Sequence, residues 1–162
     1  MNVARIKYND IADGLGVRTT VFVSGCRRHC PGCQNPETWD FDYGERFNWQ
    51  VEQMLIDSLR PSWIQGLTIC GGEPFEAENE AVLIPFLQRV RREIPGKDIW
   101  IYSGYTLEEL QGSELLRHVD VLVDGPFMAE QKDAGLAFRG SRNQRIIRLK
   151  GDANGKEETE GS

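Results

Sequence analysis

The stretch that decides the fold reads Arg18-Thr-Thr-Val-Phe-Val-Ser-Gly-Cys26-Arg-Arg-His-Cys30-Pro-Gly-Cys33. Its first half is rich in β-branched and aromatic residues and predicts a strand over 18–24. Its second half has three cysteines with the spacing C-x3-C-x2-C. Three thiolates can hold a four-iron cluster and leave one iron without a protein ligand, whereas four cysteine ligands give a closed cluster suited to electron transfer. The pattern therefore indicates an iron–sulfur site at the end of a strand.

A structural zinc site is the main alternative for these cysteines. Zinc usually takes four ligands, often as two close cysteine pairs, and only three cysteines are adjacent here. The fourth ligand would have to be His29, Cys70 or His118. A disulfide framework is disfavoured, because four cysteines in 162 residues are few and no signal peptide precedes them. Ligand preference favours the iron–sulfur interpretation.

Length and composition are typical of a globular chain with one domain, expected over 1–150. The hydrophobic fraction of 40% includes no run of the ~20 apolar residues that a membrane span needs. A net charge of −6 argues against a nucleic-acid partner. The acidic segment 151–162, which has no large apolar residue, predicts a disordered tail. Free thiols without an export signal predict a cytoplasmic location.

Strands and helices are expected to alternate along the chain. Besides 18–24, strands are predicted at 3–7, 66–70, 98–102, 119–123 and 144–149. Helices are predicted after Asn48, over 82–94, where Pro85 suggests a kink or a later start, and after Thr106, where Glu109 would complete a capping box. This alternation implies a mainly parallel sheet with right-handed crossovers. Because an eightfold barrel takes about 250 residues, the predicted fold is α/β, an open partial (βα) barrel.

A second conspicuous loop, Gly71-Gly-Glu-Pro74, follows the next predicted strand. Loops at the carboxyl ends of parallel strands form the working edge of α/β sheets, so this loop and the cysteines should lie together. Two glycines allow a ligand to approach the main chain closely. Carbonyl groups of such a turn can accept hydrogen bonds from an ammonium group, and Glu73 adds negative charge. A tight strand-to-helix turn without a ligand explains the same four residues.

Together the two motifs resemble the radical S-adenosylmethionine (SAM) superfamily. In that superfamily a cysteine triad binds a [4Fe-4S] cluster whose open iron takes SAM, and a Gly-Gly-Glu-Pro loop holds the methionine amino group of SAM. The resemblance implies cluster ligands and SAM-binding residues at matching positions. The cluster ligands would be Cys26, Cys30 and Cys33, and the SAM loop would be Gly71, Gly72, Glu73 and Pro74.

Three further residues are candidates for SAM binding. Superfamily members usually have an aromatic residue before the third cysteine, and this chain has Gly32, whose main chain would contact the adenine. Ser103 and Asp124 lie at predicted strand ends, where they could bind the ribose or the amino-acid part of SAM. Capping of a turn is the alternative for both. Cys70 ends an apolar strand and is expected to be a packed thiol.

Within the superfamily, the chain resembles the activating proteins of anaerobic ribonucleoside-triphosphate reductase. The resemblance is carried by 21–26, 30–33 with Asn35 and Trp39, 103–109, 120–125 and 139–144. It implies that a one-electron donor such as flavodoxin reduces the cluster and that SAM is cleaved to methionine and a 5′-deoxyadenosyl radical. That radical would take a hydrogen atom from a glycine, carried on a loop of the large reductase subunit.

Three other functions fit parts of the pattern. One is a radical SAM enzyme acting on a small molecule, such as 7-carboxy-7-deazaguanine synthase. Another, from a different class, is a zinc-binding module without catalysis. The third is a closed four-cysteine electron carrier, which would require Cys70 as the fourth ligand.

Overall fold

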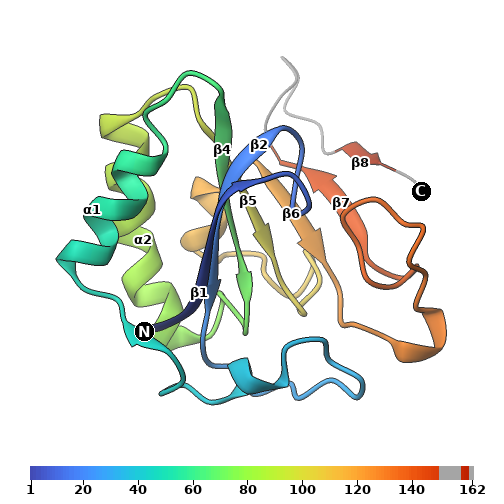
Figure 1. The fold of residues 1–162 in the computed structure, drawn as a ribbon. Coiled ribbons are helices and arrows are strands. Elements are labelled where there is room, and N and C mark those ends of the chain that lie inside the picture. The colour runs from blue at the N-terminus through green and yellow to red at the C-terminus, as the bar shows by residue number, and fades with distance from the viewer. Residues whose placement is uncertain (150–157, 161–162) are drawn as a thin grey trace.

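The computed structural model describes residues 1–149 and 158–160, whose strands form one mixed sheet in the order β3-β1-β2-β4-β5-β6-β7-β8. Two α-helices of this part of the chain pack side by side against the same face of the sheet (Figure 1). The elements are β1 (Asn2–Asp10), β2 (Val17–Val23), β3 (Glu45–Arg46), α1 (Trp49–Ser58), β4 (Ile64–Gly71), α2 (Ala77–Glu93), β5 (Asp98–Tyr102), β6 (Val121–Asp124), β7 (Arg145–Arg148) and β8 (Glu158–Glu160), with short 3-10 turns η1 (Pro36–Trp39), η2 (Leu115–His118) and η3 (Ala129–Gln131).

Alternation along the central strands gives the sheet two different faces, since successive side chains of a strand point to opposite sides. Val21 and Ile69 face the helices and join the main hydrophobic core with Leu55 of α1 and Phe86 of α2. Their neighbours on the strands, such as Cys70, lie on the opposite face. Among the described residues no helix covers that second face, so it is free to form one wall of a site.

The predicted open partial (βα) barrel with a mainly parallel sheet is wrong. In the described part of the chain only the pairs β2–β4, β4–β5 and β5–β6 are parallel, and the other four pairs are antiparallel. A parallel connection needs a crossover of about a dozen residues or more, usually a helix. The turn over 11–16 is too short for one, so β1 and β2 form a hairpin. The segment 125–144 has only a 3-10 turn, and β7 returns antiparallel to β6.

Several predictions for individual helices and caps agree with the structure better than the predicted architecture does. Asn48 caps α1 as predicted, because its side chain accepts a hydrogen bond from the Val51 amide at 3.0 Å. The second helix begins at Ala77 and continues through Pro85, so the later start is wrong. Thr106 and Glu109 form the capping-box hydrogen bonds, but 107–110 forms turns and not a helix.

The ends of the chain bear on two further expectations. The tail predicted to be disordered, 151–162, lies outside the described residues except for 158–160, which form β8 against β7. In residues 1–149 and 158–160, no helix has the length and apolar character needed to cross a membrane.

A buried arginine holds the amino-terminal ends of the parallel strands together. Arg18 is 0% exposed, and its guanidinium donates hydrogen bonds to the hydroxyl of Thr68 at 2.7 Å and to Asp98 Oδ1 at 2.6 Å. It also donates to the carbonyl of Leu15 at 2.9 Å, which fixes the turn between β1 and β2. Burial lowers the pKa of Arg18 and the charge of Asp98 opposes that shift. The ion pair with Asp98 is therefore needed to keep this cation inside the protein.

Replacing Asp98 with alanine should lower the free energy of unfolding by about 2 kcal/mol, because Arg18 stays buried without its ion-pair partner. The expected loss is below that of a fully buried pair, since the Asp98 side chain is 30% exposed. Urea unfolding measures it. The matched control is Asp57→Ala, which removes an exposed pair with Arg60 and should cost much less. Equal losses for the two variants would contradict this role of Arg18.

Candidate functional site

The parallel strands place four loops at one edge of the sheet. β2, β4, β5 and β6 all end there, at the lower edge in Figure 1, where the blue-to-cyan segment after β2 lies. Their loops and the open face of the sheet line one cavity of about 430 Å³. Seven of the predicted site residues line it: Cys26, Cys30, Cys33, Gly71, Gly72, Glu73 and Ser103.

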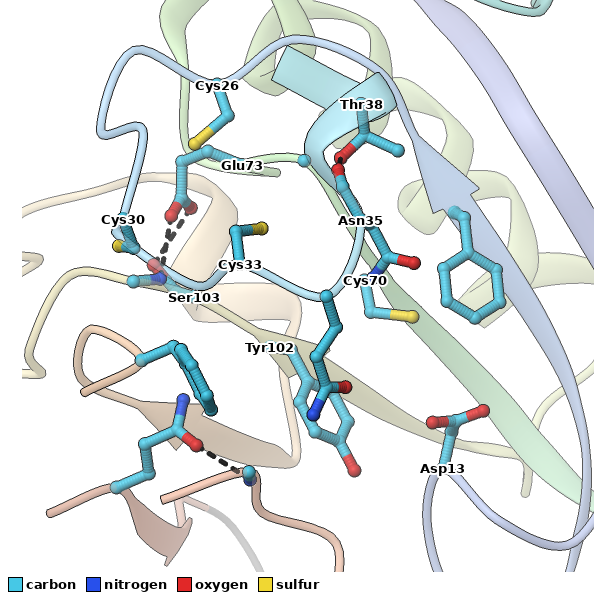
Figure 2. Close-up of a pocket in the computed structure, with 18 of the residues that line it drawn as sticks. Asp13, Cys26, Cys30, Cys33, Asn35, Thr38, Cys70, Glu73, Tyr102 and Ser103 are labelled. Carbon is cyan, nitrogen blue, oxygen red and sulfur yellow. Dashed lines mark hydrogen bonds between the residues drawn. The ribbon is translucent and has the colours of Figure 1, made fainter. Parts of the chain in front are cut away.

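The cysteine loop is a compact turn. Cys26, Cys30 and Cys33 are free thiols of intermediate exposure, and the Cys33 amide donates to the carbonyl of Cys30 at 3.0 Å. His29 adopts a left-handed conformation with φ of 47°, and its ring stacks on Trp39 with 4.4 Å between the ring centroids. The imidazole ring of His29 is therefore packed against the indole ring of Trp39. The three thiols lie around the same part of the cavity as Glu73 (Figure 2).

The cysteines fit a cluster better than a single ion. Among residues 1–149 and 158–160, no three His, Cys, Asp or Glu side chains converge closely enough to hold one metal ion. A zinc ion would need four ligands at about 2.0–2.3 Å. A four-iron cluster is a larger body whose thiolate ligands lie farther apart, and the cavity beside the triad has room for it. Cys70 is buried in β4, whereas the three cysteines of the triad have intermediate exposure.

Glu73 brings a buried carboxyl group to the wall of the cavity. It is 1% exposed and accepts hydrogen bonds from the Phe75 amide at 3.0 Å, the Gly104 amide at 2.7 Å and the hydroxyl of Ser103 at 2.8 Å. Burial raises its pKa to about 7, while these hydrogen bonds act in the opposite direction. A cationic ligand in the cavity would favour the charged carboxylate. The predicted Ser103 therefore acts on Glu73 and holds it in place.

Main-chain hydrogen bonds join the loop after β4 to the cysteine loop. The Gly72 amide donates to the carbonyl of Val23 at 2.7 Å, and the Glu73 amide donates to the carbonyl of Gly25 at 2.8 Å. Asn79 of α2, which is 0% exposed, donates from Nδ2 to the carbonyl of Glu73 at 3.0 Å and to that of Ser24 at 3.0 Å. The two loops therefore form one unit whose spacing depends on glycine.

A side chain at Gly72 should separate the two loops. Its Cβ would lie 2.7 Å from the carbonyl oxygen of Gly25 and 2.9 Å from that of Thr38. We expect Gly72→Ala to lower the free energy of unfolding by about 2 kcal/mol through this overlap and to lower the iron content after reconstitution. Urea unfolding and iron analysis measure the two effects. Gly135→Ala, where the nearest atom is a flexible side-chain oxygen at 3.3 Å, is the control and should leave both unchanged.

Two of the predicted cofactor residues, Gly32 and Pro74, do not line the cavity. Gly32 has φ of 77°, and a Cβ at this position would lie 3.4 Å from the ring of Phe127. The ring of Phe127 lines the cavity, so an aromatic side chain is supplied from the loop after β6. Pro74 is buried and directs the chain into α2.

The carboxylate of Asp124 is bound by other groups of the protein. It is 0% exposed at the end of β6, and its carboxylate accepts hydrogen bonds from the Leu107 amide at 2.7 Å and from Arg145 Nε at 3.0 Å. The same side chain forms an ion pair with Arg145. This network fixes the turn after β5 against β6 and β7, which matches the turn-capping alternative for Asp124.

Three lining side chains were not placed at the site from sequence. Arg28, Tyr102 and Arg139 each have a buried polar atom without a hydrogen-bond partner among the described residues, namely Arg28 Nε, the hydroxyl of Tyr102 and Arg139 Nη2. The guanidinium of Arg28 lies 4.7 Å from the ring centroid of Tyr105. Alternation along β5 could have placed Tyr102 on the open face. Arg28 lies within the cysteine loop and Arg139 begins the segment 139–144, so their positions in the sequence could have placed both near the site.

A pair of carboxyl groups lies at the far end of the cavity, around the turn between β1 and β2. Asp10 is buried and accepts hydrogen bonds from the hydroxyl of Thr20 at 2.7 Å and the Ala12 amide at 2.9 Å. Asp13 lines the cavity and lies 3.5 Å from Lys7 Nζ. Burial, a hydrogen bond with Asp10 and the charge of Asp10 raise the pKa of Asp13 to about 6. At neutral pH the folded protein therefore keeps two close negative charges at this turn.

The titration of Asp13 should make the protein less stable at higher pH. Because the folded state holds this proton more tightly than the unfolded chain, the stabilisation is complete below pH 3.8 and is lost as the pH rises through about 6. Asp13→Asn should match the wild type near pH 4 and exceed its free energy of unfolding by about 2 kcal/mol near pH 8. Urea unfolding at the two pH values measures this difference. A gain that is equal at both would show that the Asp13 charge is not its cause.

Several known proteins that are similar to this chain share one name, and one family model matches most of the chain's length. The family model for a 4Fe-4S single cluster domain matches residues 12–147, which confirms the predicted iron–sulfur cofactor. The anaerobic ribonucleoside-triphosphate reductase-activating protein of Haemophilus influenzae is 46% identical over 154 residues, with 93% of this chain and 99% of that protein covered. Proteins with the same name are 41% identical over 154 residues in Escherichia coli K12 (93% and 100% covered) and 38% identical over 146 residues in Enterobacteria phage T4 (90% and 93% covered).

Proposed function

This chain belongs to the family of anaerobic ribonucleoside-triphosphate reductase-activating proteins, and we propose that it is a radical SAM enzyme that forms a glycyl radical in the large subunit of that reductase. The observation that carries the proposal is the shared cavity. It brings the cysteine triad and the loop over 71–74 together at one edge of the sheet. The names of the relatives supply the class of partner.

The residues of the cavity divide into two groups with different tasks. Cys26, Cys30 and Cys33 would hold a [4Fe-4S] cluster and leave one iron free for SAM. The loop at 71–74 would bind the methionine ammonium group of SAM, because its glycines leave the main chain accessible and Glu73 offers a carboxylate. The amides of Phe75 and Gly104 and the hydroxyl of Ser103 hold that carboxylate in place.

The chemistry would come from the bound cofactors, and the chain would supply orientation and shielding. When bound, the cluster would pass one electron, delivered by a donor such as flavodoxin, to the SAM sulfonium, giving methionine and a 5′-deoxyadenosyl radical that takes a hydrogen atom from the glycine Cα. The products are 5′-deoxyadenosine and the glycyl radical. The uncovered face of the sheet, which continues from the site, offers a path for a peptide segment to the reacting atoms.

The other functions have less support. A zinc module would need a convergent ligand set, which the described residues do not form, and the matched family holds a 4Fe-4S cluster. A four-cysteine carrier would need Cys70, which is buried in β4, unlike the partly exposed cysteines of the triad. A small-molecule radical SAM enzyme would use the same triad, so its distinction from an activase is the substrate.

The proposal predicts reductive cleavage of SAM followed by transfer of the radical to a partner. Reconstituted and reduced protein should form 5′-deoxyadenosine from SAM under anaerobic conditions. With the large reductase subunit present, the electron paramagnetic resonance spectrum should show a glycyl radical. Cys30→Ala should lower both signals at least 100-fold, since the cluster loses a ligand.

Cys70→Ser is the control for that experiment and should keep the cluster and both products, because Cys70 is not a ligand. Loss of the cluster in Cys70→Ser would favour the closed electron carrier. Formation of 5′-deoxyadenosine without any radical in the reductase would favour a small-molecule substrate. A wild-type protein that holds four irons and cleaves no SAM would overturn the proposal.

A further inference from the structure

The cavity extends beyond the part that the cysteines and Glu73 line. Its deeper wall is the open face of the sheet, with Phe22 of β2, Cys70 of β4 and Tyr102 of β5. The turn that carries Asp13 closes its far end (Figure 2). Lys7 of β1 lies 5.3 Å from the ring centroid of Phe22 and borders the same wall. This deeper part is distinct from the end where the cluster and the SAM loop are placed.

Tyr102 carries an unsatisfied polar group into this deeper part. Its hydroxyl is buried and has no hydrogen-bond partner among the described residues. Buried hydroxyl groups are nearly always hydrogen-bonded in folded proteins, because desolvation without a partner costs free energy. Burial also raises the pKa of Tyr102, so the group remains an O–H that can donate a hydrogen bond. A buried donor that has no partner among the described residues, on a side chain that lines a cavity, indicates an acceptor atom supplied by a ligand.

The side chain of Tyr102 points away from the end of the cavity where SAM is proposed to bind. Tyr102 extends away from the three cysteines and toward the turn that carries Asp13 (Figure 2). SAM has to reach both the triad and Glu73, which lie at the opposite end of the cavity. The hydroxyl is therefore placed for the second substrate.

We propose that Tyr102 is a substrate-binding residue whose hydroxyl donates a hydrogen bond to a main-chain carbonyl of the glycine-bearing segment of the reductase. This inference rests on the proposed function. A peptide main chain presents a carbonyl acceptor at every residue, and a glycine has no side chain to hold that main chain away from the sheet. The neighbours Phe22 and Cys70 offer little competition for the hydrogen bond, since one is apolar and the other a weakly polar thiol. The carboxylate of Asp13 lines the same cavity but forms no hydrogen bond with the Tyr102 hydroxyl.

The test is Tyr102→Phe, which removes only the hydroxyl. The unloaded variant should melt at the same temperature as the wild type or higher, because a buried group without a partner has been removed. Formation of 5′-deoxyadenosine without the reductase should be unchanged. The affinity for the large reductase subunit and the yield of glycyl radical per 5′-deoxyadenosine should each fall about fivefold, the effect of losing one ordinary hydrogen bond. Tyr43→Phe makes the same change at an exposed tyrosine and should alter none of these quantities.

Three results would overturn this assignment. If affinity and radical yield both stay within about twofold of the wild type, the hydroxyl makes no contact with the peptide. A fall in 5′-deoxyadenosine without the reductase would place the hydroxyl on SAM. A lower melting temperature of the unloaded variant would give it a structural role. A wild type that cleaves no SAM would instead overturn the proposed function, and binding of the unloaded protein to the reductase subunit would still test Tyr102.

Discussion

The parallel pairing of β2 with β4 continues past the ends of both strands, through the hydrogen bonds from the Gly72 and Glu73 amides to the carbonyls of Val23 and Gly25. These contacts join the cysteine loop to the loop at 71–74 and set the distance between them. They require glycine, because a Cβ at position 72 would overlap the carbonyl oxygen of Gly25. The position of Glu73 relative to the cysteines depends on this junction, and Asn79 holds it from α2.

Charge is arranged in opposite ways at the two ends of the sheet. At the amino-terminal ends, Arg18 is buried and neutralised by Asp98, so the protein satisfies its own cation. At the carboxyl ends, the buried carboxyl of Glu73 has three hydrogen-bond donors and no ion-pair partner among the described residues. A carboxylate in that setting is stabilised by a cationic ligand. The first arrangement stabilises the fold, and the second suits a cationic ligand.

Local features of the site could be predicted from the sequence, and the architecture could not. The cysteine spacing, the loop at 71–74 and the cap at Asn48 depend on residues close together in the chain. The cap is confirmed, and the cysteines line one cavity with Gly71, Gly72 and Glu73. The barrel prediction failed because it treated every strand as part of a strand–helix unit, whereas the short turn over 11–16 forces a hairpin. The ion pair of Asp124 with Arg145, and the lack of a partner for the Tyr102 hydroxyl within the described part of the chain, depend on tertiary contacts that local patterns do not reveal.

Mössbauer spectroscopy of protein reconstituted with ⁵⁷Fe tests most directly whether three cysteines hold a cluster with one open iron. One of the four iron sites should differ from the others, and its spectrum alone should shift when SAM is added, because in the proposed function SAM binds the iron that no cysteine holds. Four sites that do not respond to SAM would contradict the three-cysteine assignment and indicate a closed cluster.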